Sequence, residues 1–156
     1  MDNEHLIKKF KHFADQGVIE ELSRMYYSVN ARNPQKIYTE LLQFLINNPD
    51  FNLCSIQSKI TGIAAKKECA AEKRWMFDFD TDDPAKVIEF NTDILKYANM
   101  TDKHPLDIDN RKTPHGYAIL TNRGFDTRPL FEKWDKNTVS LKRDDMLCCK
   151  WLIKFN

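Results

Sequence analysis

The segment 74–83 constrains the fold most, because aromatic residues recur in it at every second position. The aromatic positions are Trp75, Phe77 and Phe79. This period of two predicts a β-strand with one apolar face. Asp78 and Asp80 then share the opposite face. Whatever surrounds this strand has to cover the aromatic side and accommodate two neighbouring carboxylates on the other.

Two carboxylates on one face of a strand lie about 7 Å apart. They repel each other and lose hydration if buried, unless cations lie between or beside them. Divalent metal, Mg²⁺ or Mn²⁺, is the usual solution, which makes Asp78 and Asp80 candidate metal ligands. A second interpretation is an ordinary strand and turn, in which Asp82 and Asp83 cap a helix that begins at Pro84. The sequence of this segment is consistent with both a metal site and an ordinary strand followed by a helix cap.

Length and charge bound the remaining possibilities. A chain of 156 residues is long enough for one domain with a core. With 24 Lys and Arg against 23 Asp and Glu, the net charge is only +1, so no global field attracts nucleic acid or anionic membrane. The four cysteines include no C-x-x-C pair, which favours reduced, mostly buried thiols in a cytoplasmic compartment. No secretory signal or membrane-spanning stretch is evident, and no membrane partner is expected.

Hydrophobic periodicity and capping residues predict the order α, β, α, α, β, α, β, β, α, β, β. The expected helices cover 3–16, 34–47, 55–71, 84–97 and a short segment within 126–134. The expected strands cover 25–29, 74–80, 106–109, 117–121, 138–141 and 146–155, the last being apolar enough to be buried on both faces. Strand 25–29 followed by helix 34–47 suggests the first half of a βαβ unit. We therefore expect an α+β fold with helices on one mixed, mostly antiparallel sheet, divided into an N-terminal helical segment (1–23) and a domain (24–156).

A second set of candidate residues lies in the basic segment 111–128, after the expected helix 84–97 and strand 106–109. Gly116 stands where a backbone can approach a ligand, and the cationic side chains of the segment can grip anions. The candidate nucleotide-binding residues are Arg111, Lys112, His115, Gly116, Arg123 and Arg128. Metal on two aspartates, opposed by cationic side chains, is what a triphosphate requires. The alternative is a hairpin turn with exposed charges.

Three segments in this order, RWMFDFD (74–80), TPHGYAILT (113–121) and GFDTR (124–128), resemble those of small primase-like proteins of tailed bacteriophages. Those proteins in turn resemble the catalytic core of the archaeo-eukaryotic primase and primase-polymerase superfamily. The resemblance covers roughly residues 25–151. It implies an RRM-like α+β core in which Asp78 and Asp80 are catalytic and bind two divalent cations. It also implies nucleoside triphosphate and nucleic acid as partners, and the cytoplasm of an infected bacterial host as the location.

The sequence departs from the family pattern at two functional positions. Ala118 stands where the returning strand of the family carries a histidine, and alanine offers no donor to phosphate. The strand expected at 138–141 contains no carboxylate where the family has a third acid. Asp144, or Asp145 beside it, is a candidate replacement metal ligand, and His115 is a candidate for the missing donor. Loss of one positioned donor typically costs about 100- to 1,000-fold in rate.

Three functions are consistent with these residues. The first is metal-dependent nucleotidyl transfer, with Arg123 or Arg128 toward a template strand. The second is a primase-like fold without turnover, which binds nucleotide, nucleic acid or a host protein. The third is a metal-dependent nuclease. Trp134 and Trp151 are expected to pack in the core rather than to stack on bases, and the sequence does not indicate the oligomeric state.

Overall fold

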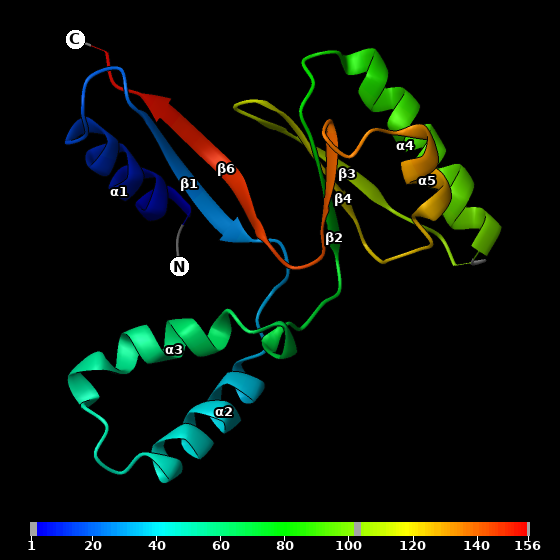
Figure 1. The fold of residues 1–156 in the computed structure, drawn as a ribbon. Coiled ribbons are helices and arrows are strands. Elements are labelled where there is room, and N and C mark those ends of the chain that lie inside the picture. Colours follow the sequence, from blue (N-terminus) through cyan, green and yellow to red (C-terminus); the bar gives the residue numbers. More distant parts are fainter. Residues whose placement is uncertain (1–2, 102–103, 156) are drawn as a thin grey trace.

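The helices and strands of the protein follow the predicted order (Figure 1). The computed structural model describes residues 3–101 and 104–155. The helices are α1 (Asn3–Asp15), α2 (Pro34–Asn47), α3 (Ile56–Ala64), α4 (Pro84–Thr101) and α5 (Arg128–Lys133), with short 3₁₀ turns η1 (Leu53–Ser55) and η2 (Lys67–Cys69). The strands are β1 (Leu22–Ser28), β2 (Trp75–Phe79), β3 (Ile108–Thr113), β4 (Gly116–Thr121), β5 (Val139–Lys142) and β6 (Met146–Ile153).

The described strands form two sheets instead of the predicted single sheet. One contains β1 and β6, and the other has the order β3-β4-β2-β5. Every pairing in them is antiparallel, so the α+β class is confirmed and the expectation of a mixed sheet is wrong. The suggested βαβ unit is also wrong, because β1 pairs with β6 and lies in a different sheet from β2.

Helices α4 and α5 cover one face of the four-stranded sheet and enclose the aromatic core. Phe77 and Phe79 are fully buried there, as the period of two predicts. The Phe90 ring of α4 lies 5.5 Å from Phe77 and 5.2 Å from Phe79, measured between ring centroids. The Trp134 ring lies 5.1 Å from Phe90, so its expected place in the core is confirmed. This face is the main hydrophobic core.

The opposite face of the same sheet is packed with smaller side chains against the β1–β6 sheet. Met76, Ala118 and Leu120 form a separate buried cluster with Val29 and Leu147. Met76 of β2 thus belongs to this cluster, whereas Trp75, Phe77 and Phe79 belong to the core on the helical face. The cluster is small, and a cavity lies beside it.

Asn30 joins the connections that link the two sheets. Its side chain is almost fully buried, at 1% exposure, and its Oδ1 accepts a hydrogen bond of 2.7 Å from the backbone N–H of Arg74. Its Nδ2 donates to the carbonyls of Arg74 (3.2 Å) and Arg143 (3.3 Å) and to Oδ1 of Asp144 (3.2 Å). Asp144 also accepts a hydrogen bond of 3.0 Å from Arg32. These hydrogen bonds fix three connecting segments against one another: the one before α2, the one before β2 and the one between β5 and β6.

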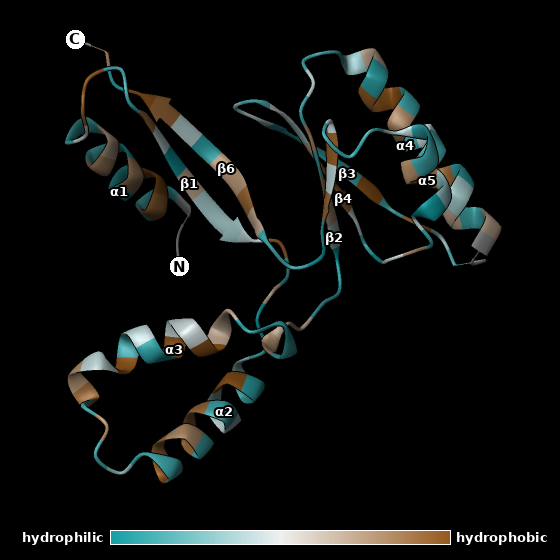
Figure 2. Ribbon diagram, in the orientation of Figure 1, coloured by the Kyte–Doolittle hydropathy of each residue, from teal (hydrophilic) through white to brown (hydrophobic). Residues whose placement is uncertain are grey.

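Helices α2 and α3 extend away from both sheets (Figure 1). Asn33 caps α2 as predicted, since its side chain accepts hydrogen bonds from the N–H groups of Gln35 and Lys36. Helix α3 ends at Ala64 rather than continuing to residue 71. Figure 2 shows hydrophobic residues along both helices, although α2 contains no buried residue.

The N-terminal helix packs on the two-stranded sheet. It lies against β6 and buries Phe10 and Ala14. The expected boundary between residues 23 and 24 falls inside β1, which runs from Leu22 to Ser28. Among the described helices, none has the length and apolar character needed to cross a bilayer.

Two local expectations are corrected by the structure. Strand β6 is not buried on both faces, because a two-stranded sheet leaves much of it open and residues such as Met146 and Ile153 are exposed. The four cysteines are free thiols, but only Cys69 and Cys148 are buried, while Cys54 and Cys149 are exposed.

Candidate functional site

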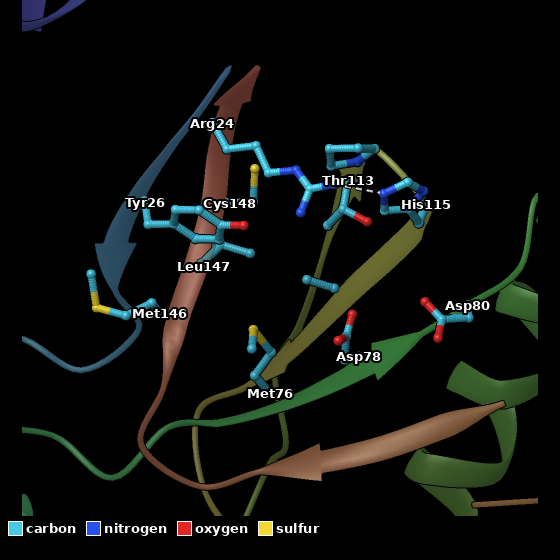
Figure 3. Close-up of a pocket in the computed structure, with 12 residues that line it drawn as sticks. Arg24, Tyr26, Met76, Asp78, Asp80, Thr113, His115, Met146, Leu147 and Cys148 are labelled. Atoms are coloured by element: carbon cyan, nitrogen blue, oxygen red, sulfur yellow. Dashed lines mark hydrogen bonds between the residues drawn. The ribbon is translucent and has the colours of Figure 1, made fainter. Parts of the chain in front are cut away.

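A cavity of about 150 Å³ lies between the two sheets (Figure 3). The four-stranded sheet and the β3–β4 turn contribute Met76, Asp78, Asp80, Thr113, Pro114, His115 and Ala118. The two-stranded sheet contributes Arg24, Tyr26, Met146, Leu147 and Cys148. Of the candidate residues identified in the sequence, the structure thus brings Asp78, Asp80 and His115 together.

Asp78 and Asp80 form the acidic wall of the cavity. Asp78 is half-buried on β2, and Asp80 is exposed just beyond the end of the strand. Neither carboxylate makes a hydrogen bond or ion pair with a residue in the described part of the chain. Burial raises the pKa of Asp78 above its ordinary value, and the charges of Asp80 and Asp145 raise it further, against opposing effects of Lys142 and His115. The negative form of Asp78 is therefore less favoured in the folded protein than it would be in water.

The strand register shows what stands beside Asp78. It pairs with Ala118 of β4 on one side and with Ser140 of β5 on the other. These are the strands on which the resemblance implies a histidine and a third acid. An alanine and a serine flank the carboxylate instead, so neither register partner of Asp78 carries a charge. The nearest charge on these two strands is that of Lys142, two residues beyond Ser140 on β5, which opposes the rise in the pKa of Asp78.

Arg24 and His115 form the wall that faces the two aspartates (Figure 3). The Nη2 nitrogen of Arg24 on β1 lies 2.8 Å from Nε2 of His115. Because a guanidinium can only donate, Nε2 accepts, which places the proton of the neutral ring on Nδ1. This bond spans the two sheets. The sequence identified His115 but not Arg24, whose only signal is its alternation with Tyr26 in a strand.

Gly116 has a structural role in place of the expected open approach to a ligand. A Cβ at this position would lie 2.2 Å from the carbonyl oxygen of Phe79 and 2.8 Å from the nitrogen of Thr81. Its φ of +156° adds strain for any other residue. The space beside the glycine is filled by the backbone around Asp80, so Gly116 permits β4 to lie close to the end of β2.

Arg111 and Lys112 lie on β3 and not in a turn. Arg111 pairs in register with Ala118, on the cavity face of the sheet, but its Nε and Nη2 atoms donate to Asp109 at 2.9 and 2.7 Å. Lys112 lies on the opposite face, where Nζ is 3.2 Å from Asp82. Neither residue lines the cavity.

Arg123 and Arg128 are also placed away from the cavity. Arg123 donates to the carbonyls of His104 (2.5 Å) and Gly124 (3.3 Å), beyond the end of β4 that is remote from Asp80. Arg128 begins α5 on the helical side of the sheet and donates to Asp126 at 2.6 Å. Hydrogen bonds from Arg128 lower the pKa of Asp126 to about 2.

Asp144 does not join the two aspartates. Its side chain is 6% exposed and is occupied by Arg32 and Asn30. Across residues 3–101 and 104–155, no group of three or more His, Cys, Asp and Glu side chains is arranged to hold a metal ion. A pair of carboxylates such as Asp78 and Asp80 is sufficient for Mg²⁺, which commonly binds one or two carboxylates and completes its shell with water and substrate phosphates.

Comparisons with protein-family models, with curated proteins and with solved structures find no match to this chain.

Proposed function

We propose that the protein binds a nucleotide, free or as part of a nucleic acid, through a divalent cation held by Asp78 and Asp80. The observation that carries this proposal is the composition of one cavity. Two carboxylates that have no hydrogen-bond or ion-pair partner among the described residues form one wall, and Arg24 with His115 forms the other.

The charges on the two walls suit a metal–phosphate complex. Mg²⁺ or Mn²⁺ would remove the repulsion between Asp78 and Asp80 and would polarise the phosphate oxygens that complete its shell. Arg24 retains N–H donors beyond the one directed at His115, so it can bind phosphate oxygens while that bond persists. Phosphate is therefore attracted from both walls.

A primase-like ancestry is part of the same proposal. An Asp-x-Asp segment at the end of an interior strand, with the returning strand β4 beside it, agrees with the RRM-like core that the resemblance implies. Ala118 and Ser140 on either side of Asp78 favour binding over turnover. Nucleotidyl transfer is thus the second candidate, and host-protein binding or nuclease activity follows it.

Calorimetry with ATP tests the proposal. Wild-type protein should bind ATP with Mg²⁺ present and lose binding with a chelator. Asp78→Asn or Asp80→Asn should weaken binding by at least about tenfold, since even outer-shell changes at metal sites cost 10- to 100-fold. Asp50→Asn, which changes an exposed carboxylate before η1, is the matched control and should bind like wild type. Equal binding by all variants, or binding that ignores the metal, would contradict the proposal.

Reaction assays separate the second candidates. Single-stranded DNA, nucleoside triphosphates and Mn²⁺ should give no product above that of the Asp78→Asn/Asp80→Asn double variant if the protein only binds. Extension products would establish nucleotidyl transfer, and cleavage of labelled RNA or DNA would establish a nuclease. Failure to bind either nucleotide or nucleic acid would leave a host protein as the remaining partner class.

A further inference from the structure

The cavity has two chemically different halves (Figure 3). The half formed by β2 and the β3–β4 turn is charged and contains Asp78, Asp80 and His115. Arg24 of β1 reaches His115 and belongs to this charged half, whereas the other lining residues from β1 and β6 are largely apolar and rich in sulfur. The residues of this apolar half are Tyr26, Met146, Leu147 and Cys148, and Met76 lies at the boundary. A ligand that consists only of phosphate would leave the second half unfilled.

Tyr26 is the aromatic residue of this apolar half. It pairs in register with Cys148, and its ring extends from β1 toward the cavity with the hydroxyl group pointing inward. The residue as a whole is 45% exposed. Its side chain makes no ring contact, cation–π contact or hydrogen bond with any residue in the described ranges. The rings of the core, such as Phe79 and Phe90, in contrast pack on one another.

We infer that Tyr26 holds the base of the bound nucleotide by stacking, so that the site recognises nucleotides and not phosphate groups in general. This inference rests on the proposed function and adds the base to it. A flat, polarisable base suits an aromatic ring next to methionine and cysteine sulfur. Stacking on an aromatic side chain tolerates all bases, because each has a π-face. The phosphates of the same molecule then reach the charged half.

The test compares ATP with inorganic tripolyphosphate, both with Mg²⁺, by calorimetry. Wild-type protein should bind ATP more tightly than tripolyphosphate. Tyr26→Leu should lower the affinity for ATP by about tenfold or more, as loss of a stacking residue does, and should leave the affinity for tripolyphosphate unchanged. Tyr26→Phe keeps the ring and should retain most of the preference for ATP.

Tyr27→Leu is the matched control, because Tyr27 is the next residue of β1, has the same 45% exposure and does not line the cavity. It should bind both ligands like wild type. Thermal unfolding of each variant verifies that the fold is retained. Equal affinities of wild type for the two ligands, or equal effects of Tyr26→Leu and Tyr27→Leu on ATP, would overturn the inference while Mg²⁺-dependent phosphate binding stands. If neither ligand binds in the presence of Mg²⁺, the proposed function fails together with it.

Discussion

The two faces of the four-stranded sheet each have a carboxylate near them, and the protein treats the two in opposite ways. On the helical side, Asp93 of α4 is 8% exposed and accepts hydrogen bonds from Nζ of Lys133 (2.7 Å) and Nε1 of Trp134 (2.8 Å). Burial alone would raise the pKa of Asp93, but these bonds outweigh it and the pKa lies below its ordinary value. On the cavity side, Asp78 has no such partner within residues 3–101 and 104–155, and its pKa is raised.

We interpret this difference as a difference in role: Asp93 stabilises the fold, whereas Asp78 is placed to bind a cation. A buried charge is costly unless it is paired and hydrogen-bonded, and the helical face meets that requirement within the chain. Beside an aromatic core, Asp93 therefore contributes to stability. The cavity face leaves the requirement unmet at Asp78, where a bound cation can meet it. We interpret the unmet requirement as the sign of the binding site.

The largest expected effect concerns the core of the helical face. Phe90→Ala should lower the free energy of unfolding by about 3–5 kcal/mol, because a fully buried ring between Phe77, Phe79 and Trp134 is removed. Ile88→Ala on the same helix, where the side chain is 67% exposed, is the control and should change it by about 0.5 kcal/mol or less. Urea denaturation measures both. Similar losses for the two variants would show that this face is not the principal core.

The next effect concerns the junction between the sheets. Asn30→Ala removes the amide that bonds to Arg74, Arg143 and Asp144 and leaves buried backbone groups without partners, which should cost about 1–3 kcal/mol. Because this junction fixes the two walls of the cavity relative to each other, the affinity for Mg²⁺–ATP should also fall. Denaturation and calorimetry on the same variant measure the two effects. A stable variant with unchanged affinity would show that the junction does not position the site.

Asp93→Asn should also destabilise the protein at neutral pH, by about 1–3 kcal/mol, through the lost charge-assisted bonds to Lys133 and Trp134. Since the folded pKa of Asp93 is lowered, its contribution is present above the ordinary value of 3.8 and disappears as the pH falls through the folded pKa. The stability difference between wild type and variant should therefore shrink in acid. Denaturation at several pH values tests this, and a difference independent of pH would refute it.

The smallest effect has the opposite sign. Without metal, Asp78→Asn should raise the free energy of unfolding slightly at neutral pH, because the ionised carboxyl is disfavoured in the folded state. A raised folded pKa means that Asp78 favours folding only when protonated, so its unfavourable effect appears as the pH rises above the ordinary value. Denaturation without metal measures the difference. A loss of stability like that of Asp93→Asn would remove the contrast between the two faces.

Local sequence patterns predict the order of the helices and strands and some of the residues that line the cavity. Alternation identifies β2, and Asn33 before Pro34 identifies the start of α2, because these signals depend on a few neighbouring residues. The division into two sheets depends on the pairing of residues 22–28 with 146–153, which no local pattern encodes. A continuous apolar run likewise cannot show that β6 would lie in a two-stranded sheet.

The same limit applies to the site. Asp78, Asp80 and His115 stand out in short segments, whereas Arg24 and Tyr26 reach the cavity only through the remote pairing of β1 with β6. Arg123 and Arg128 are cationic residues in a suggestive segment, but nearby oxygen acceptors occupy them. The charge and spacing of residues in the sequence indicate candidate ligand-binding side chains. Which of these side chains remain available to a ligand depends on the hydrogen-bond partners that the fold brings next to them.

The most direct test is an NMR titration of the Asp78 side-chain carboxyl, first without metal and then with Mg²⁺ and ATP. The metal-free protein should show a pKa for Asp78 above the ordinary value of 3.8, and the metal and nucleotide should lower it, because a bound cation favours the ionised carboxylate. An ordinary pKa in the metal-free protein that does not change on adding Mg²⁺ and ATP would contradict the account.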